Sequence, residues 1–164
     1  MSSAIYNIEV NLGKQTLELL DGDKAIKRYL VSTAKNGAGE IMDSECTPRG
    51  RHVIAEKIGA QQPINTVFVG RRANGEIYTP ELHSKHPQRD WILTRILRLR
   101  GEEPGRNLHG RVDSYDRYIY IHGTPADVEL GKPGSHGCIR MGNEDIIELF
   151  ELVKEGTHVH IRES

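Results

Sequence analysis

The sequence lacks an excess of charge of either sign. Its 164 residues include 22 lysines and arginines against 23 aspartates and glutamates, which leaves a formal net charge of −1. A protein without a basic excess has no general electrostatic attraction to nucleic acid or to an anionic lipid surface. The composition therefore predicts that neither nucleic acid nor a membrane is a partner.

Cysteines and long apolar runs are also scarce. Cys46 and Cys138 are the only two cysteines. Two are too few for a disulfide scaffold, and nothing in the sequence requires a bridge between them. No segment approaches the roughly 18 apolar residues of a membrane span. The first ten residues have neither the basic start nor the apolar stretch of a secretory signal, so we expect a cytoplasmic protein.

What the chain does contain is typical of a globular protein. Hydrophobic residues make up 37% of it and charged residues 27%. Both values lie near the averages for folded domains, which excludes disorder over most of the chain. A chain of this length is sufficient for one core. We predict that residues 1–164 form a single domain.

Alternating apolar and polar residues in the first third of the chain indicate a β-meander. Gly13-Lys14 and Asp21-Gly22 are its expected turns. The expected strands cover residues 5–12, 16–20, 25–32, 52–57, 66–72, 92–99, 118–122 and 157–162. One helix is expected over 143–154, with Asn143 as its N-cap and Gly156 as its stop signal.

This order of elements predicts a mainly β protein, a β-sandwich of mixed sheets or a partly open barrel, with one helix in its C-terminal half. Segments 35–50, 73–90, 100–114 and 123–137 are expected to be loops. Long ordered loops often carry function. We expect 73–90 and 100–114 to form a lid beside the active site that excludes large polymeric acceptors.

The residues that carry chemistry lie in one segment, 121–141, which reads IHGTPADVELGKPGSHGCIRM. It holds Cys138 with two histidines, His122 and His136. A cysteine nucleophile works as the thiolate and needs a nearby base, for which imidazole is the usual partner. The segment between His122 and Cys138 is long enough to bring the two side chains together, so we predict a cysteine nucleophile activated by histidine.

The neighbours of Cys138 suit the same chemistry. The amides of Gly137 and Cys138 are candidates for an oxyanion hole. Arg140 has the geometry to bind a carboxylate with two hydrogen bonds. The dipole of the helix starting at Asn143 is a candidate for keeping Cys138 ionised.

Other interpretations of these residues stay open. His122, His136 and Cys138 together form a known type of zinc ligand set, and His83 with His86 is a second, weaker metal candidate. No second cysteine or acidic base accompanies the first set, so acyl transfer without metal or cofactor is preferred. Cys46 lies in a polar loop without a histidine nearby, and we expect no catalytic role for it.

The segment resembles the L,D-transpeptidase catalytic domain, or YkuD-type, family. That motif is a histidine followed, after a loop, by Ser/Thr-His-Gly-Cys and an Arg or Asn two residues later. Here it reads His122-Gly123-Thr124 and Ser135-His136-Gly137-Cys138-Ile139-Arg140. Segment 47–50, Thr-Pro-Arg-Gly, also resembles a turn of this family, as does the ending 153–161. The resemblance is strong over 115–162 and weaker in the first half.

The resemblance implies a role for each matching residue. Cys138 would be the nucleophile, His122 its base, and Gly123 the residue whose backbone carbonyl orients His122. The turn of Ser135, His136 and Gly137 would shape the oxyanion and substrate site, and Arg140 would face the substrate. It also implies a β-sandwich with a small helical element.

The implied substrates are peptidoglycan stem peptides, cleaved through a thioester on Cys138. For a cytoplasmic protein, water is the expected acceptor. We therefore predict an L,D-carboxypeptidase of muropeptide recycling that removes the terminal D-Ala from tetrapeptides. The alternative is an L,D-transpeptidase that forms cross-links or exchanges D-amino acids. A non-catalytic muropeptide-binding or thiol-sensing module and a metal enzyme are the rivals. The sequence predicts no oligomeric state.

Overall fold

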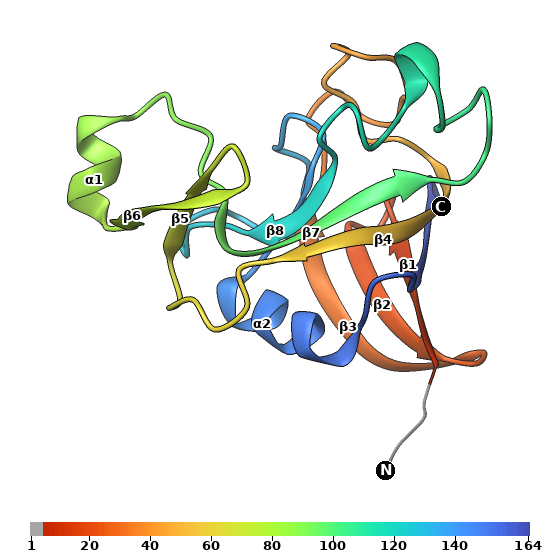
Figure 1. The fold of residues 1–164 in the computed structure, drawn as a ribbon, viewed down its shortest axis with the longest axis horizontal. Helices are drawn as coiled ribbons and strands as arrows, with labels where there is room; N and C mark the ends of the chain where they lie inside the picture. Colours follow the sequence, from red (N-terminus) through yellow and green to blue (C-terminus); the bar gives the residue numbers. More distant parts are fainter. Residues whose placement is uncertain (1–4) are drawn as a thin grey trace.

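The computed structural model describes residues 5–164, and its ten strands form one continuous hydrogen-bonded sheet (Figure 1). The strands are β1 Tyr6–Asn11, β2 Thr16–Asp21, β3 Lys24–Ser32, β4 Gly50–Ile58, β5 Thr66–Val69, β6 Arg72–Ile77, β7 Leu93–Gly101, β8 Tyr120–Gly123, β9 Ile139–Met141 and β10 His158–Arg162. The helices are α1 Pro80–Lys85, α2 Asn143–Leu152 and a short 3-10 turn, Gly110–Val112.

The sheet closes on itself into a barrel. Its order is β4-β10-β1-β2-β3-β9-β8-β7-β5-β6, and β4 also pairs with β7, so the first eight strands in this order form a closed ring. The predicted sandwich is therefore wrong. A β-sandwich consists of two separate sheets packed face to face. Here the long antiparallel pairing of β4 with β7 closes a single sheet into a ring. Parallel pairs β1–β10 and β8–β9 make the sheet mixed, as expected.

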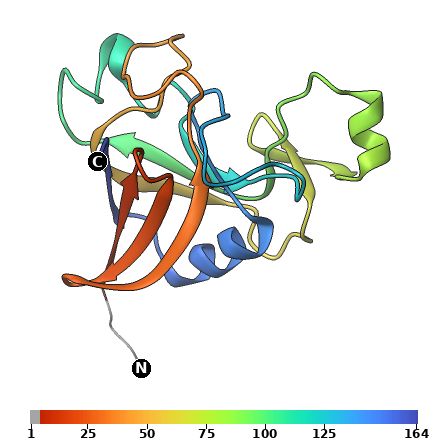
Figure 2. The same cartoon turned by 180° about the vertical axis from the view of Figure 1, so that it is seen from behind.

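One apolar core fills the barrel. Alternate residues of β1 and β2 point inward, and Ile8, Val10, Leu17 and Leu19 are almost fully buried. The same core includes Ile146, Leu149 and Phe150 of α2, which packs its apolar face against the sheet (Figures 1 and 2). The period-2 and period-3.6 patterns of the sequence thus meet in a single core, as such patterns should.

A second part of the structure projects from the barrel, and we call it the arm, residues 66–91. It contains the β5–β6 hairpin and α1, seen at the left of Figure 1. A small apolar cluster of Val67, Trp91 and Leu93, with Tyr78 and Leu82 against it, joins the arm to β7. The arm therefore has its own packing, separate from the barrel core.

The arm corrects two predictions. The strand expected over 66–72 is divided by a turn at Gly70-Arg71, where both residues have positive φ, 56° and 68°. Such values are typical of a type I′ hairpin turn, in which glycine or asparagine is preferred and arginine is unusual. The segment 73–90, expected as a loop, carries β6 and α1. The segment 100–114 was also expected as a loop. Its first two residues belong to the end of β7, and it contains the 3-10 turn Gly110–Val112.

The remaining differences are small. β9 was not predicted because it has only three residues. The helix occurs as expected, but its N-cap is Gly142. The side chain of Asn143 instead accepts a hydrogen bond from Thr94 Oγ1 at 2.6 Å and donates one to Asn65 Oδ1 at 2.9 Å. Asn143 thus connects the helix to the start of β7 and to the loop before β5.

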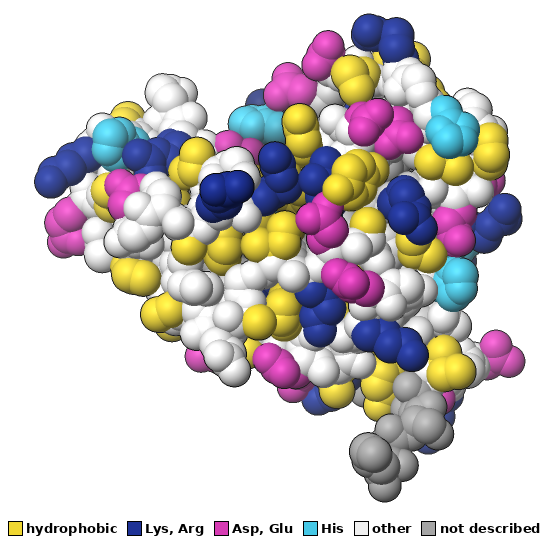
Figure 3. Space-filling view, viewed as in Figure 1, with side chains coloured by type: hydrophobic (Ala, Val, Ile, Leu, Met, Phe, Trp, Pro, Cys, Tyr) yellow, Lys and Arg dark blue, Asp and Glu magenta, His cyan; other side chains and the backbone are white. Residues whose placement is uncertain are grey.

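Positive and negative side chains are interspersed over the face shown in Figure 3, in keeping with the balanced composition. Among residues 5–164, no helix is both long and apolar enough to span a membrane.

Candidate active site

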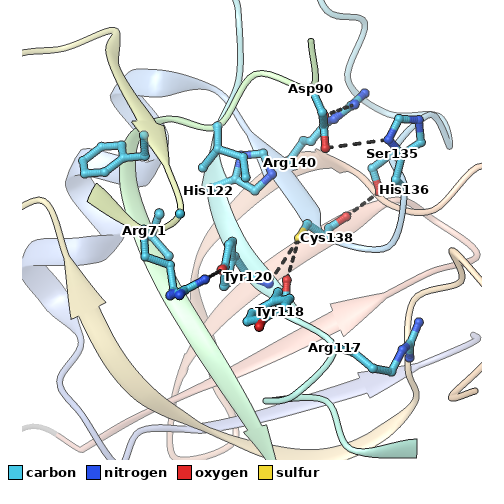
Figure 4. A pocket seen from close by; sticks show the side chains of 14 residues that line it. Arg71, Asp90, Arg117, Tyr118, Tyr120, His122, Ser135, His136, Cys138 and Arg140 are labelled. Atoms are coloured by element: carbon cyan, nitrogen blue, oxygen red, sulfur yellow. Dashed lines mark hydrogen bonds and ion pairs between the residues drawn. The ribbon is translucent and has the colours of Figure 1, made fainter. Parts of the chain in front are cut away.

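A cleft of about 290 Å³ lies between the turn of the β5–β6 hairpin and the barrel wall formed by β7 and β8 (Figure 4). Cys138, His122, Ser135, His136 and Arg140 all line it. The structure therefore brings most of the sequence-predicted site residues into one place. No residue of 100–114 lines the cleft, so this part of the expected lid is wrong.

Cys138 stands at the end of a tightly held turn. Ser135 Oγ donates to the Cys138 carbonyl at 2.6 Å and accepts from the Gly137 N–H at 3.2 Å. From the loop before β4, the buried Thr47 donates its hydroxyl to the Gly137 carbonyl at 2.9 Å. The hydroxyls of Ser135 and Thr47 are therefore used to hold the turn.

These contacts change the expected oxyanion hole. The Gly137 amide already donates to Ser135, so it is not free to bind a substrate oxygen. The amide of Cys138 has no hydrogen-bond acceptor among residues 5–164. Of the two amides predicted from the sequence, only that of Cys138 remains available for an oxyanion.

The sulfur of Cys138 contacts the backbone of the neighbouring segment on both sides. The Tyr120 N–H points to Sγ at 3.3 Å, and the Tyr118 carbonyl accepts from Sγ at 3.3 Å (Figure 4). Removal from water raises the pKa of the Cys138 thiol to about 12, although the Tyr120 N–H acts in the opposite direction. Burial at this position thus favours the neutral thiol over the thiolate that the sequence led us to expect.

The dipole of α2 is too distant to favour ionisation of the Cys138 thiol. The strand β9 separates Cys138 from α2. Three strand residues span about 10 Å, and the effect of a helix terminus fades within its first turn. The expected assistance from the helix at Asn143 is absent for this reason.

His122 is buried on β8 and lines the same cleft. Its Nδ1 lies 2.6 Å from the Gly123 carbonyl. A carbonyl only accepts, so Nδ1 carries the ring hydrogen and Nε2 is left with a lone pair. Burial lowers the pKa of His122, which favours this neutral form. The imidazole is thus prepared to accept a proton.

Gly123 has no room for a side chain. A Cβ at this position would overlap with Asn143 Oδ1, and it would lie 2.6 Å from the Leu93 carbonyl oxygen and 3.0 Å from the Thr94 Cβ. The absence of a side chain lets β8 lie close to β7 at the point where the Gly123 carbonyl meets His122. The glycine therefore fixes the position of the histidine through packing as well as through its carbonyl.

Comparison with known proteins agrees with this geometry. The family model of the L,D-transpeptidase catalytic domain, YkuD, matches residues 5–161. The chain belongs to the L,D-transpeptidase catalytic domain family. It is 36% identical over 107 residues to YbiS of Escherichia coli K12, a probable L,D-transpeptidase, covering 63% of this chain and 34% of that protein.

Two further relatives extend the comparison. The YkuD protein of Bacillus licheniformis is 29% identical over 157 residues, which cover 95% of this chain and 65% of that protein. The chain thus spans only part of the length of these relatives. The crystal structure of L,D-transpeptidase 3 from Mycobacterium tuberculosis has the same fold, with a TM-score of 0.59 at 14% identity, covering 98% of this chain and 61% of that one.

In this L,D-transpeptidase family member, Arg140 lines the cleft and is paired there with an acidic side chain. Its Nη2 lies 3.0 Å from Asp90 Oδ1 and its Nη1 donates to the Gly134 carbonyl at 3.1 Å. The exposed His136 lies at the rim of the cleft, with Nδ1 3.7 Å from the other oxygen of Asp90. Asp90, at the end of the arm, thus neutralises the arginine that the sequence assigned to substrate binding.

Besides Asp90, sequence reasoning assigned no role to several polar residues that line the cleft, among them Arg71, Arg117, Tyr118 and Tyr120. Arg117 is tied to the 36–47 loop through the carbonyls of Gly39 and Cys46. Arg71 reaches in from the hairpin turn. The only sequence signal for the two tyrosines was their place just before His122; the arginines gave none.

The metal interpretations find little support. No group of three or more histidine, cysteine or acidic side chains converges as metal ligands within the described part of the chain. His83 accepts a hydrogen bond from Trp91 Nε1 at 3.0 Å and so takes part in the packing of the arm. Cys46 is half-buried, with its sulfur near the carbonyls of Asn36 and Ser44.

Proposed function

We propose that this protein is a cysteine-dependent L,D-carboxypeptidase that removes the terminal D-Ala from peptidoglycan tetrapeptide stems. The observation that carries the proposal is that Cys138 and His122 line one cleft, where the Nδ1 hydrogen of His122 is committed to the Gly123 carbonyl. Family membership supports the substrate class.

The resting protonation states define the mechanism. Because burial favours the thiol and the neutral imidazole, His122 Nε2 accepts the thiol proton as Sγ attacks the carbonyl carbon of the third stem residue. The tetrahedral oxyanion forms beside the Cys138 amide. The C–N bond to D-Ala then breaks, and the proton passes from His122 to the departing amine. A thioester on Cys138 remains.

Water completes the reaction. His122 accepts a proton from water as the oxygen attacks the thioester carbonyl, the C–S bond breaks, and the sulfur takes that proton back. The sum is tetrapeptide plus water giving tripeptide plus D-Ala. The cleft has a volume at the lower end of ordinary ligand sites, which supports a small acceptor such as water. A site of action in the cytoplasm, with recycled muropeptides as substrates, is part of the proposal.

The second candidate is an L,D-transpeptidase with an amine acceptor. A neighbouring hollow of about 370 Å³ shares Asp90, His136 and Arg140 with the cleft and extends beneath the arm. It offers a route by which a second stem peptide could approach the thioester from the other side of these residues. Chains related to this one are L,D-transpeptidases by name, which keeps this candidate open.

The test is the fate of a defined disaccharide-tetrapeptide, followed by mass spectrometry with and without an added amine acceptor. Loss of one alanine as the main change in both conditions supports hydrolysis. Dimers or exchanged D-amino acids as the main products would support transfer. The Cys138→Ala protein serves as the control, and D-Ala release by this variant would contradict both candidates.

A further inference from the structure

Arg71 is placed over the cleft at a cost in backbone energy. It occupies the second position of the β5–β6 turn with φ 68°, in the left-handed region where a non-glycine residue costs roughly 1–2 kcal/mol. Glycine would be free of this cost, and it stands one position earlier instead. Strain of this kind, kept at the edge of an active-site cleft, suggests a function for the side chain.

The guanidinium of Arg71 is held in place but not neutralised. Its Nη1 donates to the Tyr120 hydroxyl at 3.3 Å (Figure 4). The guanidinium carbon, Cζ, lies 4.9 Å from the centre of the Tyr118 ring. Arg98 approaches the same ring at 5.2 Å. Among residues 5–164, Arg71 forms no ion pair with a carboxylate, since the nearby Glu56 is paired with Arg98.

The other arginines of the cleft differ in this respect. Arg140 is paired with Asp90, and Arg117 is occupied by the backbone carbonyls of the 36–47 loop. Arg71 has one hydrogen bond to a neutral hydroxyl and four remaining N–H groups. It is therefore the cleft arginine best able to bind an anion from outside with two parallel hydrogen bonds.

The distance from Arg71 to the nucleophile selects which anion this is. Tyr120 spans the interval, because its backbone N–H meets Cys138 Sγ and its hydroxyl meets Arg71. Arg71 thus lies about one tyrosine side chain away from the sulfur. The carboxylate of the leaving D-Ala is only one residue from the attacked carbonyl, whereas a carboxylate at the end of a long side chain on the attacked residue reaches much further.

We propose that Arg71 is a specificity-determining residue that binds a carboxylate at the end of the side chain of the third stem residue. This inference rests on the proposed function. It predicts a preference for stems with a free side-chain carboxylate at that position, as in diaminopimelate, over stems with lysine or with the carboxylate amidated. Arg140, which the sequence suggested for substrate binding, is not needed for this contact.

The experiment compares three tetrapeptides that differ only in the third residue: diaminopimelate, its side-chain amide and lysine. D-Ala release is measured for the wild type, Arg71→Gln and Arg72→Gln. Glutamine is unbranched like arginine, so it suits the same turn. Arg72 is exposed on the same hairpin and lines no part of the cleft, which makes it the matched control.

For the wild type, we expect kcat/KM on the diaminopimelate peptide to exceed that on the other two by about 10- to 100-fold, as for a charge-assisted pair. Arg71→Gln should remove this preference by lowering only the diaminopimelate value, and Arg72→Gln should keep it. Equal activity of the wild type on all three, or an equal loss on all three in Arg71→Gln, would overturn the inference while leaving the proposed function intact.

A binding measurement separates the two proposals. The Cys138→Ala protein, with and without Arg71→Gln, is titrated with the same three peptides by calorimetry. If the wild type releases no D-Ala from any peptide, the proposed function fails. Tighter binding of the free-carboxylate peptide that depends on Arg71 would still support the role of this arginine, and binding independent of Arg71 would reject it.

Discussion

The barrel wall and the arm contribute to the cleft in different ways. On the barrel wall, Cys138 and His122 are held by backbone groups: the carbonyls of Tyr118 and Gly123 and the amide of Tyr120. On the arm, Arg71 and Asp90 act through exposed or half-buried side chains. The proposed reacting groups are thus fixed by the fold, whereas the proposed substrate contact of Arg71 lies on the arm.

The electrostatic settings of the two regions differ as well. Burial on the barrel wall raises the pKa of Cys138 and lowers that of His122, which favours the uncharged form of both groups. The arm instead contributes an ion pair across the cleft, that of Asp90 with Arg140. Changes in the wall should therefore affect rate and stability, and changes in the arm should affect substrate binding.

The largest effect should follow from Cys138→Ser. A hydroxyl has a much higher pKa than a thiol and is a far weaker nucleophile with the same base, so D-Ala release should fall by about three orders of magnitude or more. The measurement is kcat/KM on a defined tetrapeptide. Cys46→Ser is the matched control and should retain activity within a few-fold. Similar losses in both variants would mean that the sulfur of Cys138 has no special role.

Gly123→Ala tests the packing of the barrel wall. The new methyl would press on the Leu93 carbonyl, a backbone atom that cannot move aside easily, so we expect a loss of about 3 kcal/mol in the free energy of unfolding, at the upper end for overpacking. Urea unfolding measures it. In Gly134→Ala the nearest atom to the methyl, Ser32 Oγ at 3.3 Å, belongs to a side chain, and a much smaller loss is expected. Equal losses would show that the close approach at Gly123 is not the cause.

Acid should destabilise the barrel through its buried histidines. Burial lowers the pKa of His52 to about 4, while its unfolded value is about 6.5. Between these values the unfolded chain binds a proton that the folded chain excludes, so stability is lost as the pH falls through this window. For His52 alone the loss between pH 7 and pH 5 should be about 2 kcal/mol.

His52→Gln should remove that part of the pH dependence in urea unfolding at pH 7 and pH 5. His122 acts in the same direction and is unaffected by this variant, so some dependence should remain. His86→Gln on the exposed surface of the arm is the control and should keep the wild-type difference. If His52→Gln lost as much stability between pH 7 and pH 5 as the wild type does, the assignment of this loss to His52 would be contradicted.

The smallest effect should follow from Asp90→Asn. The change frees Arg140 and removes a negative charge from a cleft proposed to bind anionic peptides. Because the pair is partly exposed, its strength is about 1 kcal/mol, and KM should fall about fivefold with little change in kcat. Asp127→Asn, beside the neighbouring hollow, is the control. A rise in KM would instead mean that Asp90 orients Arg140 toward the substrate.

Apolar periodicity along the chain predicts much of the barrel. The meander, the final strand and the C-terminal helix were predicted from apolar periodicity, because these elements bury one face against the core. The motif placed His122, Gly123 and Cys138 close together along the chain, and family membership is established by a match over 5–161. The catalytic roles of these residues stay predictions until the variants are measured.

The remaining features depend on contacts between segments that are distant in the sequence. Barrel closure depends on the pairing of β4 with β7, which are far apart in sequence and carry no local signal for it. The thiol state of Cys138 follows from desolvation, and the neutralised Arg140 from an aspartate 50 positions away. The position of Arg71 depends on the β5–β6 turn and on the contacts of its guanidinium with Tyr118 and Tyr120. Periodicity and motif spacing are local properties, whereas burial, charge pairing and closure arise only when distant segments meet.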